Sequence, residues 1–245
     1  MNKLQVLFDS PDFIAIDKPA GLATIPGRGE ADSAFERLAR QIGLLSTGNT
    51  DPRLRVVHRL DKDTSGVLLF ARHVAAQRHV SHQFQNNRVA KEYLAIVAGN
   101  PDGREGVIEA PLAVHPADKT KMHVSKRGRP AITAWRVEQS FRRYALVRCF
   151  PKTGKTHQIR VHLAHLGHPL IVDPLYGPCT SLLLSSFKRG YHPSQKDAER
   201  PLIVRLTLHA EKLAFENLQD DRVQVTSPLP KDFRAALNQL SKYAR

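Results

Sequence analysis

Short apolar runs separated by turn residues dominate the hydrophobic pattern of this chain of 245 residues. Runs of this length, rich in aliphatic and aromatic side chains and bounded by turn residues, are typical of β-strands. The pattern predicts strands at residues 4–8, 13–16, 54–57, 67–71, 93–97 and 144–150. Strands should therefore supply most of the regular structure.

Helices are fewer, and we expect them at about 33–42, 74–85 and 157–166, with a closing helix marked by Phe233, Leu237 and Leu240. In the third helix, apolar residues recur at the spacing of one helix face, and Gly167 follows as a stop signal. Arg160 lies at the shoulder of this apolar stripe. We expect it to be half-buried and to have an anionic partner, because an unpaired buried charge is unfavourable.

Two stretches, 115–130 and 178–200, have the composition of long loops and are rich in basic residues. The first contains Lys119, Lys121, Lys126, Arg127 and Arg129. Basic loops suit contacts to phosphates, although a solvated run of charge would have the same composition.

The overall charge points to a polyanionic partner. Lysine and arginine number 37 against 23 acidic residues, a formal net charge of +14. Nucleic acid is the first candidate partner for such a chain, although a soluble basic protein could carry the same charge. No internal repeat or linker divides the sequence, so we expect one domain over 1–245, which could be bilobal, and a monomer.

Other broad classes are disfavoured by composition. Two cysteines, Cys149 and Cys179, are too few for a disulfide framework and are not spaced as zinc ligands, which favours a reducing cytoplasm. Acidic residues interrupt the apolar residues near the start, so the sequence predicts no signal peptide there. No apolar run approaches the ~20 residues of a membrane span.

The most informative local feature is a polar loop at 58–66, His-Arg-Leu-Asp-Lys-Asp-Thr-Ser-Gly, between two predicted strands. Such loops commonly display functional groups. We assign Asp63 to turn structure, in which short polar side chains satisfy nearby backbone groups. Asp61 closes an extended segment that could direct it into a cleft. Spacing alone leaves both a catalytic and a structural role open for Asp61.

Three other patterns are weaker. Gly154-Lys155-Thr156 has the ending of a phosphate-binding loop, but the first glycine of that pattern would fall at Cys149. Histidines occur at 157, 162, 165 and 168, yet they do not share one helix face, so we expect solvated or RNA-facing histidines and no metal site. Asp61 and Asp63 are too close in one loop to flank a glycosidic bond from opposite sides.

Several blocks together resemble the RluA-type pseudouridine synthase family. The block at 58–72, HRLDKDTSGVLLFAR, resembles the family signature in which the aspartate attacks the target nucleotide. IDKPAGLATIPG at 16–27 resembles its first motif, and KEYLAIVAG at 91–99 its tyrosine motif. TGKTHQIRVHLAHLGHPLIVDPLYG at 153–177 resembles the third motif, and LHAEKLAF at 208–215 the C-terminal strand block. These blocks occur in the same order over about four-fifths of the chain.

The resemblance implies an α+β fold, with a mixed, largely antiparallel sheet core flanked by helices and a basic cleft for RNA. It implies conversion of uridine to pseudouridine without a cofactor, with Asp61 as nucleophile, Tyr93 stacking on the target base and Arg160 as the cation beside Asp61. Arg59 would occupy the space of the flipped nucleotide. Lys18, Pro19 and Gly21 would support the catalytic loop.

We assign further RNA contacts to Lys126, Arg127, Arg129, Lys155 and His157. Many family members carry an N-terminal S4 RNA-binding module, whereas this sequence starts with the first catalytic-domain strand. A non-catalytic RNA-binding or assembly protein on the same fold is the main alternative, and a nucleoside hydrolase is another. The sequence does not specify whether transfer RNA or ribosomal RNA is the substrate.

Overall fold

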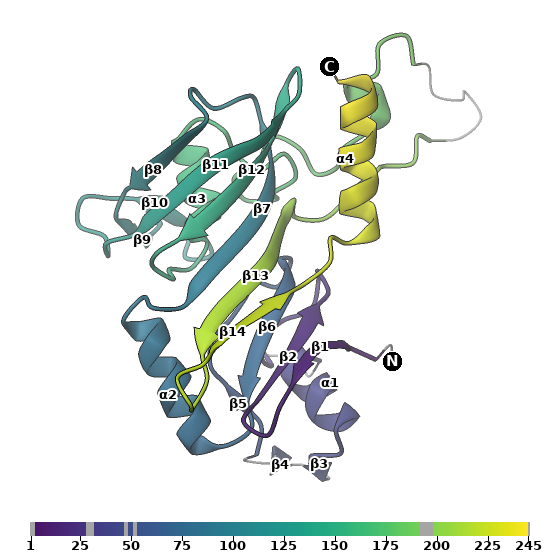
Figure 1. Cartoon of the computed structure of the whole chain (residues 1–245). Helices are drawn as coiled ribbons and strands as arrows, with labels where there is room; N and C mark the ends of the chain where they lie inside the picture. The colour runs from purple at the N-terminus through teal and green to yellow at the C-terminus, as the bar shows by residue number, and fades with distance from the viewer. Residues whose placement is uncertain (1–2, 28–31, 47–48, 51–52, 192–197, 245) are drawn as a thin grey trace. The chain divides into compact units, whose positions relative to one another are not determined.

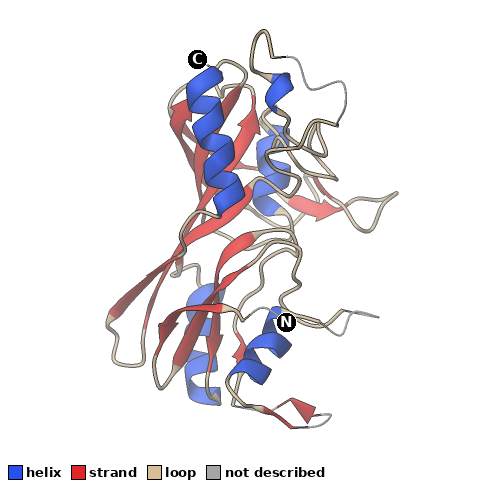
Figure 2. Cartoon of the chain, turned by 90° about the vertical axis from the view of Figure 1, so that its right-hand side faces the viewer, coloured by secondary structure: helices blue, strands red, loops and turns tan. Residues whose placement is uncertain are grey.

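The computed structural model describes residues 3–27, 32–46, 49–50, 53–191 and 198–244. The chain divides into two compact units (Figure 1). Unit 1 comprises Met1–Glu92 and Ala210–Pro228, and unit 2 comprises Tyr93–His209 and Leu229–Arg245. The chain crosses from unit 1 to unit 2 within strand β7 (Ala90–Ala98) and returns within strand β13 (Leu208–Glu216). Each unit combines strands with helices, as Figure 2 shows by colour.

Unit 1 is built on strands β1 (Gln5–Asp9), β2 (Phe13–Lys18) and β6 (Ser65–Ala71), which lie side by side in that order. β2 pairs antiparallel with both neighbours. β13 follows β6 in the sheet and pairs with β14 (Arg222–Thr226), and β5 (Arg55–Val56) pairs with β6. The other elements of unit 1 are α1 (Ala34–Gln41), the short strands β3 (Leu45–Ser46) and β4 (Asn49–Thr50), and α2 (Val74–Gln85).

The core of unit 1 forms around β6, all seven residues of which are buried. Phe13 of β2 packs edge-on against Phe215 of β13, with ring centroids 5.0 Å apart. Ala76 and Val80 of α2 join the same apolar cluster. A strand that is buried on both faces tolerates only small or apolar side chains, which explains the continuous apolar run that predicted it.

Unit 2 contains the strand order β7-β12-β11-β8, and each adjacent pair is antiparallel. Its strands are β8 (Glu105–Glu109), β9 (Leu112–Val114), β10 (Met122–Val124), β11 (Ile132–Ser140) and β12 (Tyr144–Pro151). Its helices are α3 (Gln158–His165), the 3-10 helix η1 (Leu184–Ser186) and α4 (Lys231–Tyr243). Ile159 and Leu163 of α3 pack into the apolar cluster of β7, β11 and β12, and α4 inserts Phe233 and Leu240 into a second cluster.

The α+β class with a mixed, largely antiparallel sheet is confirmed, and so are the four predicted helices. The prediction of one long loop at 115–130 is partly wrong, because Met122–Val124 forms β10 and pairs antiparallel with β9. A strand of three residues is too short to produce a clear alternation of apolar and polar positions. For the loop predicted at 178–200, residues 192–197 lie outside the described part, and η1 forms within the rest.

Among the described residues, none of the helices has both the length and the apolar character that a membrane crossing requires.

Candidate active site

The polar loop of unit 1 leads from β5 into β6 and contains a tight turn. The backbone N–H of Thr64 donates to the carbonyl of Asp61 at 3.1 Å, which places Lys62 and Asp63 at the centre of the turn. Asp61, the predicted nucleophile, opens the turn and is partly buried. This backbone turn agrees with the assignment of Asp63 to turn structure.

Lys18 fastens this turn to the first motif. It ends β2 and is completely buried. Its Nζ donates to the carbonyls of Leu22 at 2.7 Å, Lys62 at 2.8 Å and Pro19 at 3.0 Å. Carbonyl oxygens compensate the ammonium for the water that it loses on burial. Lys18 thus ties the residue directly after Asp61 to the turn at 19–22, which is the support expected of the first motif.

Thr24 holds the residue directly before Asp61. Its hydroxyl donates to the carbonyl of Leu60 at 2.9 Å and accepts the backbone N–H of Leu60 at 3.1 Å. Both backbone groups of one residue are therefore satisfied by a single buried side chain. Asp61 lies between two residues whose backbones are bound by Lys18 and Thr24, so its own position is closely constrained.

His58 supports the start of the loop as a neutral imidazole. Its Nε2 accepts the backbone N–H of Leu69 at 3.0 Å, and its ring stacks on Phe84 at 4.9 Å. Desolvation of the ring, with a further contribution from the positive charge of Lys91, lowers the pKa of His58 to about 3. His58 is therefore uncharged at neutral pH and acts here as a hydrogen-bond acceptor.

Gly66 allows an unusually close approach of two strands of unit 1. Its φ is +119°, and a Cβ built at this position would lie 2.1 Å from the carbonyl oxygen of Ala210. No side chain fits at that distance. The glycine that ends the polar loop is therefore required by packing.

In unit 2, the third motif forms a bonded network at the start of α3. Gln158 donates to the carbonyl of Ile132 and to the hydroxyl of Thr133, both at 2.9 Å, and its Oε1 accepts the backbone N–H of Lys155 at 3.0 Å. His157 precedes the helix with a φ of +54°. Residues other than glycine rarely adopt this left-handed conformation, so surrounding contacts must hold His157 in place.

Arg160 forms a buried ion pair with Asp173. Its Nε donates to Oδ2 of Asp173 at 2.8 Å and its Nη2 to Oδ1 at 2.7 Å, and the two side chains are 6% and 0% exposed. Two parallel bonds fix the plane of the guanidinium as well as its charge. The sequence predicted an anionic partner for Arg160 but did not identify Asp173, and Arg160 is more deeply buried than expected.

Tyr176 links Arg160 to His157. The guanidinium of Arg160 lies over the ring of Tyr176 at 5.1 Å. The hydroxyl of Tyr176 accepts the backbone N–H of Met122 at 2.7 Å and lies 2.9 Å from Nδ1 of His157. Asp173 also accepts the backbone N–H groups of Leu175 and Tyr176. Asp173 and Tyr176, near the end of the third motif, therefore fix the positions of Arg160 and His157 near its start.

Tyr93, the predicted stacking residue, lies on β7 opposite Cys149 of β12. It is partly buried and packs against the apolar cluster that contains Ile159 and Leu163 of α3. Tyr93 and Arg160 thus belong to unit 2, whereas Asp61 and Arg59 belong to unit 1. The pairing of Asp61 with Arg160 remains a prediction.

The expectation of solvated histidines in the third motif is wrong for His162. This side chain is completely buried, and its ring nitrogens lie 2.9 Å from the Thr133 hydroxyl and from the Ala110 carbonyl. Burial lowers its pKa. His165 is exposed, and His157 and His168 are partly buried. In the described part of the chain, no group of three or more histidine, cysteine or acidic side chains is arranged to hold a metal ion.

The basic loop presents Lys126, Arg127 and Arg129 to solvent. Lys126 and Arg127 occupy a turn closed by the Gly128 N–H, which donates to the Ser125 carbonyl at 2.8 Å. Arg129 then pairs its backbone with Leu112 of β9. The three cations are therefore carried on hydrogen-bonded backbone and are not on a free coil.

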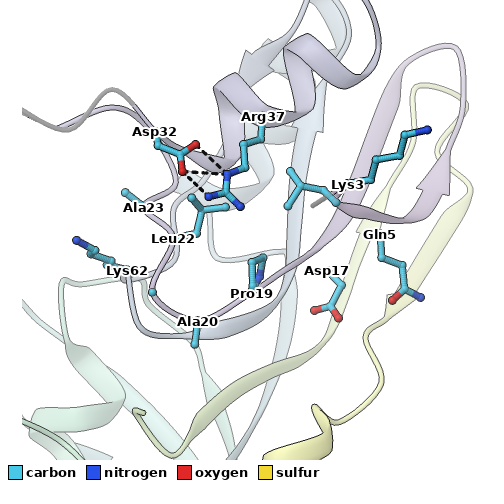
Figure 3. A pocket seen from close by; sticks show the side chains of 12 residues that line it. Lys3, Gln5, Asp17, Pro19, Ala20, Leu22, Ala23, Asp32, Arg37 and Lys62 are labelled. Atoms are coloured by element: carbon cyan, nitrogen blue, oxygen red, sulfur yellow. Dashed lines mark hydrogen bonds and ion pairs between the residues drawn. The ribbon is translucent and has the colours of Figure 1, made fainter. Parts of the chain in front are cut away.

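A cavity of about 650 Å³ lies in unit 1 beside the first motif (Figure 3). The turn at 19–23 forms one wall, and Lys62 reaches it from the polar loop. Its residues Arg37 and Asp32 form an ion pair with each other. Lys62, and not Asp61, belongs to the described lining, so this cavity does not by itself define the reaction site.

Comparison with known proteins identifies the family to which this fold and these motifs belong. The family model described as RNA pseudouridylate synthase matches residues 12–165. The chain belongs to this family.

Related sequences align with nearly the whole of this chain. Ribosomal large subunit pseudouridine synthase D of Nitrosomonas europaea is 39% identical over 239 residues, which cover 96% of this chain and 64% of that protein. The protein of the same name from Xanthomonas campestris pv. campestris is 37% identical over 246 residues, covering 97% of this chain and 69% of that protein. The chain thus spans less than two thirds of the length of the first of these relatives.

Solved structures show the same fold. Human RNA pseudouridylate synthase domain containing 4 has a TM-score of 0.70 and 25% identity, covering 97% of this chain and 93% of that chain. Human RNA pseudouridylate synthase domain containing 1 has a TM-score of 0.69 and 26% identity, covering 93% of this chain and 84% of that chain.

Proposed function

We propose that this protein is an RNA pseudouridine synthase that isomerises uridine in structured RNA, and that large-subunit ribosomal RNA is its substrate class. The observation that carries the proposal is the turn at residues 61–64 of unit 1, whose backbone is bound on both sides of Asp61. Within the segment matched by the family model, Lys18 and Thr24 bind the backbones on either side of Asp61. The names of the bacterial relatives support ribosomal RNA over transfer RNA.

Pseudouridine formation breaks the bond between N1 of the base and the ribose, turns the base, and rejoins it through C5. No atom enters or leaves the nucleotide overall, so the reaction needs no cofactor. An ionised carboxylate suits this chemistry because it can attack the sugar carbon or take a proton from it. We assign this role to Asp61.

We assign two residues of unit 2 to the same reaction. Arg160 is assigned as the cation that acts with the Asp61 carboxylate, and its pair with Asp173 fixes the orientation of the guanidinium. Tyr93 stacks on the target base and acts on a proton during the rearrangement. Tyr93 and the apolar side of α3 pack into one cluster of unit 2, which supports a fixed position for the tyrosine ring.

The target uridine must leave its stack to reach a carboxylate, at a cost of a few kcal/mol. Arg59 is exposed directly before Leu60, and we assign it to the space that the flipped base vacates. The exposed Lys126, Arg127 and Arg129, together with Lys155 and His157, bind phosphates of the RNA. The net charge of +14 suits a polyanionic partner such as RNA.

The test is the substitution Asp61→Asn, which removes the charge and the nucleophile while keeping the size of the side chain. We expect a folded protein that forms no pseudouridine on unmodified large-subunit ribosomal RNA. Mapping of pseudouridine positions in the RNA measures this. RNA affinity should persist, because phosphate contacts supply it. The matched control is Asp63→Asn, two positions away in the same turn, which should retain most activity.

The outcomes separate the alternatives. Activity that survives Asp61→Asn but not Asp63→Asn would show that the nucleophile is misassigned. A wild-type protein that binds RNA but forms no pseudouridine on any cellular RNA would favour a non-catalytic RNA-binding or assembly role. Release of free base would indicate a hydrolase.

A further inference from the structure

A second basic feature of unit 2 lies at the end of α4, in a hollow of about 180 Å³. Residues from three segments meet there: the turn between β11 and β12, the segment at and after η1, and the end of α4. Its described lining is Arg142, Arg143, Tyr144, Ser185, Ser186, Phe187, Lys188, Arg189 and Ala244. Four of these nine side chains are cationic and none is acidic.

No carboxylate of the described residues is paired with the four cations. Among the described residues, no carboxylate lies within ion-pair distance of Arg142, Arg143, Lys188 or Arg189. Elsewhere in the same unit, Arg148 pairs with Glu138. Like charges that converge without counter-charges repel one another, so a pocket that gathers four cations suits an anion from outside the protein.

The pocket is held together by specific contacts. The ammonium of Lys188 lies over the rings of Tyr243 at 4.4 Å and Tyr191 at 5.1 Å. The backbone N–H of Arg142 donates to the carbonyl of Ala244 at 2.6 Å, which joins the turn between β11 and β12 to the end of α4. The ring of Phe187 packs edge-on against Tyr144 at 6.2 Å. The cations are therefore displayed from packed elements.

The local charge also affects neighbouring groups. A hydrogen bond from Lys242 and the positive charge of Lys188 lower the pKa of Tyr243. Glu199 reaches the same segment, but its carboxylate accepts the backbone N–H of Ser185 at 2.9 Å. The exposed guanidinium groups of Arg142, Arg143 and Arg189 remain available to an anion from solvent.

Size and chemistry select the ligand. Pockets for drug-sized molecules hold about 300–1,000 Å³, so a hollow of about 180 Å³ takes a smaller group. Guanidinium groups bind phosphate through paired hydrogen bonds, and serine hydroxyls add weaker ones. We propose that this pocket, defined by Arg142, Arg143, Lys188 and Arg189, binds a backbone phosphate of the RNA substrate. The proposal rests on the proposed function and adds an RNA contact to those of the loop at 115–130.

The experiment compares two triple variants of equal charge. The pocket variant carries Arg142→Gln, Arg143→Gln and Arg189→Gln. The control carries Arg78→Gln, Arg222→Gln and Arg234→Gln, three exposed arginines outside the pocket. Affinity for a labelled, unmodified transcript of large-subunit ribosomal RNA is measured by fluorescence anisotropy as the salt concentration is raised. Each lost phosphate contact lowers the log–log salt slope by about 0.7–0.9.

We expect the pocket variant to bind several-fold more weakly and with a flatter slope, and the control to match the wild type. Equal losses in both variants would show an effect of net charge alone, and no loss in either would show that the pocket does not contact RNA. Both results would overturn the proposal. If the triple variant does not fold, Arg189→Gln alone should flatten the slope by less, and Arg189→Lys should restore it.

A free anion is the alternative occupant. Titration of inorganic phosphate alone, followed by calorimetry, detects it directly. Phosphate binding that is lost in the pocket variant while its RNA affinity is unchanged would overturn the assignment to RNA. A wild type that binds RNA through the pocket but forms no pseudouridine would refute the proposed function and still support the pocket.

Discussion

The loop that carries Asp61 and the helix that carries Arg160 are stabilised in opposite ways. In unit 1, a buried cation and a hydroxyl bind backbone atoms of Leu60 and Lys62. In unit 2, a buried carboxylate binds the guanidinium of Arg160 itself. The first arrangement fixes where Asp61 is, whereas the second fixes both the position and the charge environment of Arg160.

This difference predicts how mutations affect the stability and the activity contributed by each region. Removing a donor from the backbone clamp of unit 1 frees a loop but leaves the strands on both sides packed. Removing the carboxylate from unit 2 takes from a buried guanidinium the anion that compensates its burial, which costs folding free energy directly. Mutations should therefore separate the two regions by the ratio of their effects on stability and on activity.

The largest loss of stability is expected for Asp173→Asn. Breaking a buried ion pair by neutralising one partner costs about 3–5 kcal/mol, and here the partner is a guanidinium that is 6% exposed. Urea unfolding followed by circular dichroism measures the change. The control is Asp232→Asn, which breaks the more exposed pair of Asp232 with Arg205 and should cost about 1 kcal/mol or less. Equal losses in the two variants would contradict the comparison.

An intermediate loss of stability, with a larger loss of activity, is expected for Lys18→Met. The substitution leaves buried carbonyls without their donor, at about 2 kcal/mol, and releases the turn after Asp61. If Lys18 positions the turn, kcat should fall while KM for RNA changes little. Lys62→Met, which leaves the Lys62 carbonyl in place, should keep stability within about 0.5 kcal/mol of the wild type. A fall in activity no greater than the unfolded fraction would limit Lys18 to folding.

The third prediction concerns acid sensitivity, and near pH 6 its effect is the smallest of the three. The folded pKa of His58 is about 3, below its ordinary value of 6.5, so the unfolded chain binds a proton that the folded protein excludes. This contribution to stability is present above pH 6.5 and is lost as the pH falls from 6.5 toward 3, at about 1.4 kcal/mol per pH unit.

The variant His58→Gln, which keeps an acceptor for the Leu69 N–H, should have a shallower dependence of unfolding free energy on pH below 6.5. Part of the dependence should remain, because burial also lowers the pKa of His162 in unit 2. Identical pH profiles for the variant and the wild type would contradict the prediction, because they would mean that His58 takes up its proton at the same pH in the folded and the unfolded states.

The sequence predicted best those elements whose signals are local. The helix at Val74–Gln85 and the strand Ser65–Ala71 follow from continuous or periodic apolar residues, and α3 follows from its apolar stripe and the glycine after it. Strand β11 was missed because its inward side chains include the polar Thr133 beside Trp135, which breaks the alternation. Its identity as a strand depends on pairing with β12 and β8.

The candidate site could be predicted only in part for the same reason. The polar loop and the first motif were recognised, but the three carbonyls that Lys18 binds lie in two separate turns that only the folded chain brings together. Asp173 precedes a proline, so in sequence it resembles an ordinary turn residue. His162 was expected in solvent because its acceptor and hydroxyl partners, Ala110 and Thr133, come from distant segments.

The contact of Gly66 with Ala210 has a consequence for the order of synthesis. The strand that carries the end of the polar loop reaches its neighbour only when residues 210–216 are available, because Ala210 belongs to the returning segment of unit 1. On the ribosome, the first 92 residues emerge long before that segment, so unit 1 lacks β13 and β14 while unit 2 is being made. A nascent chain truncated before residue 210 should therefore leave β6 without its pairing partner β13, lack Leu213 and Phe215 in the apolar cluster, and remain sensitive to protease.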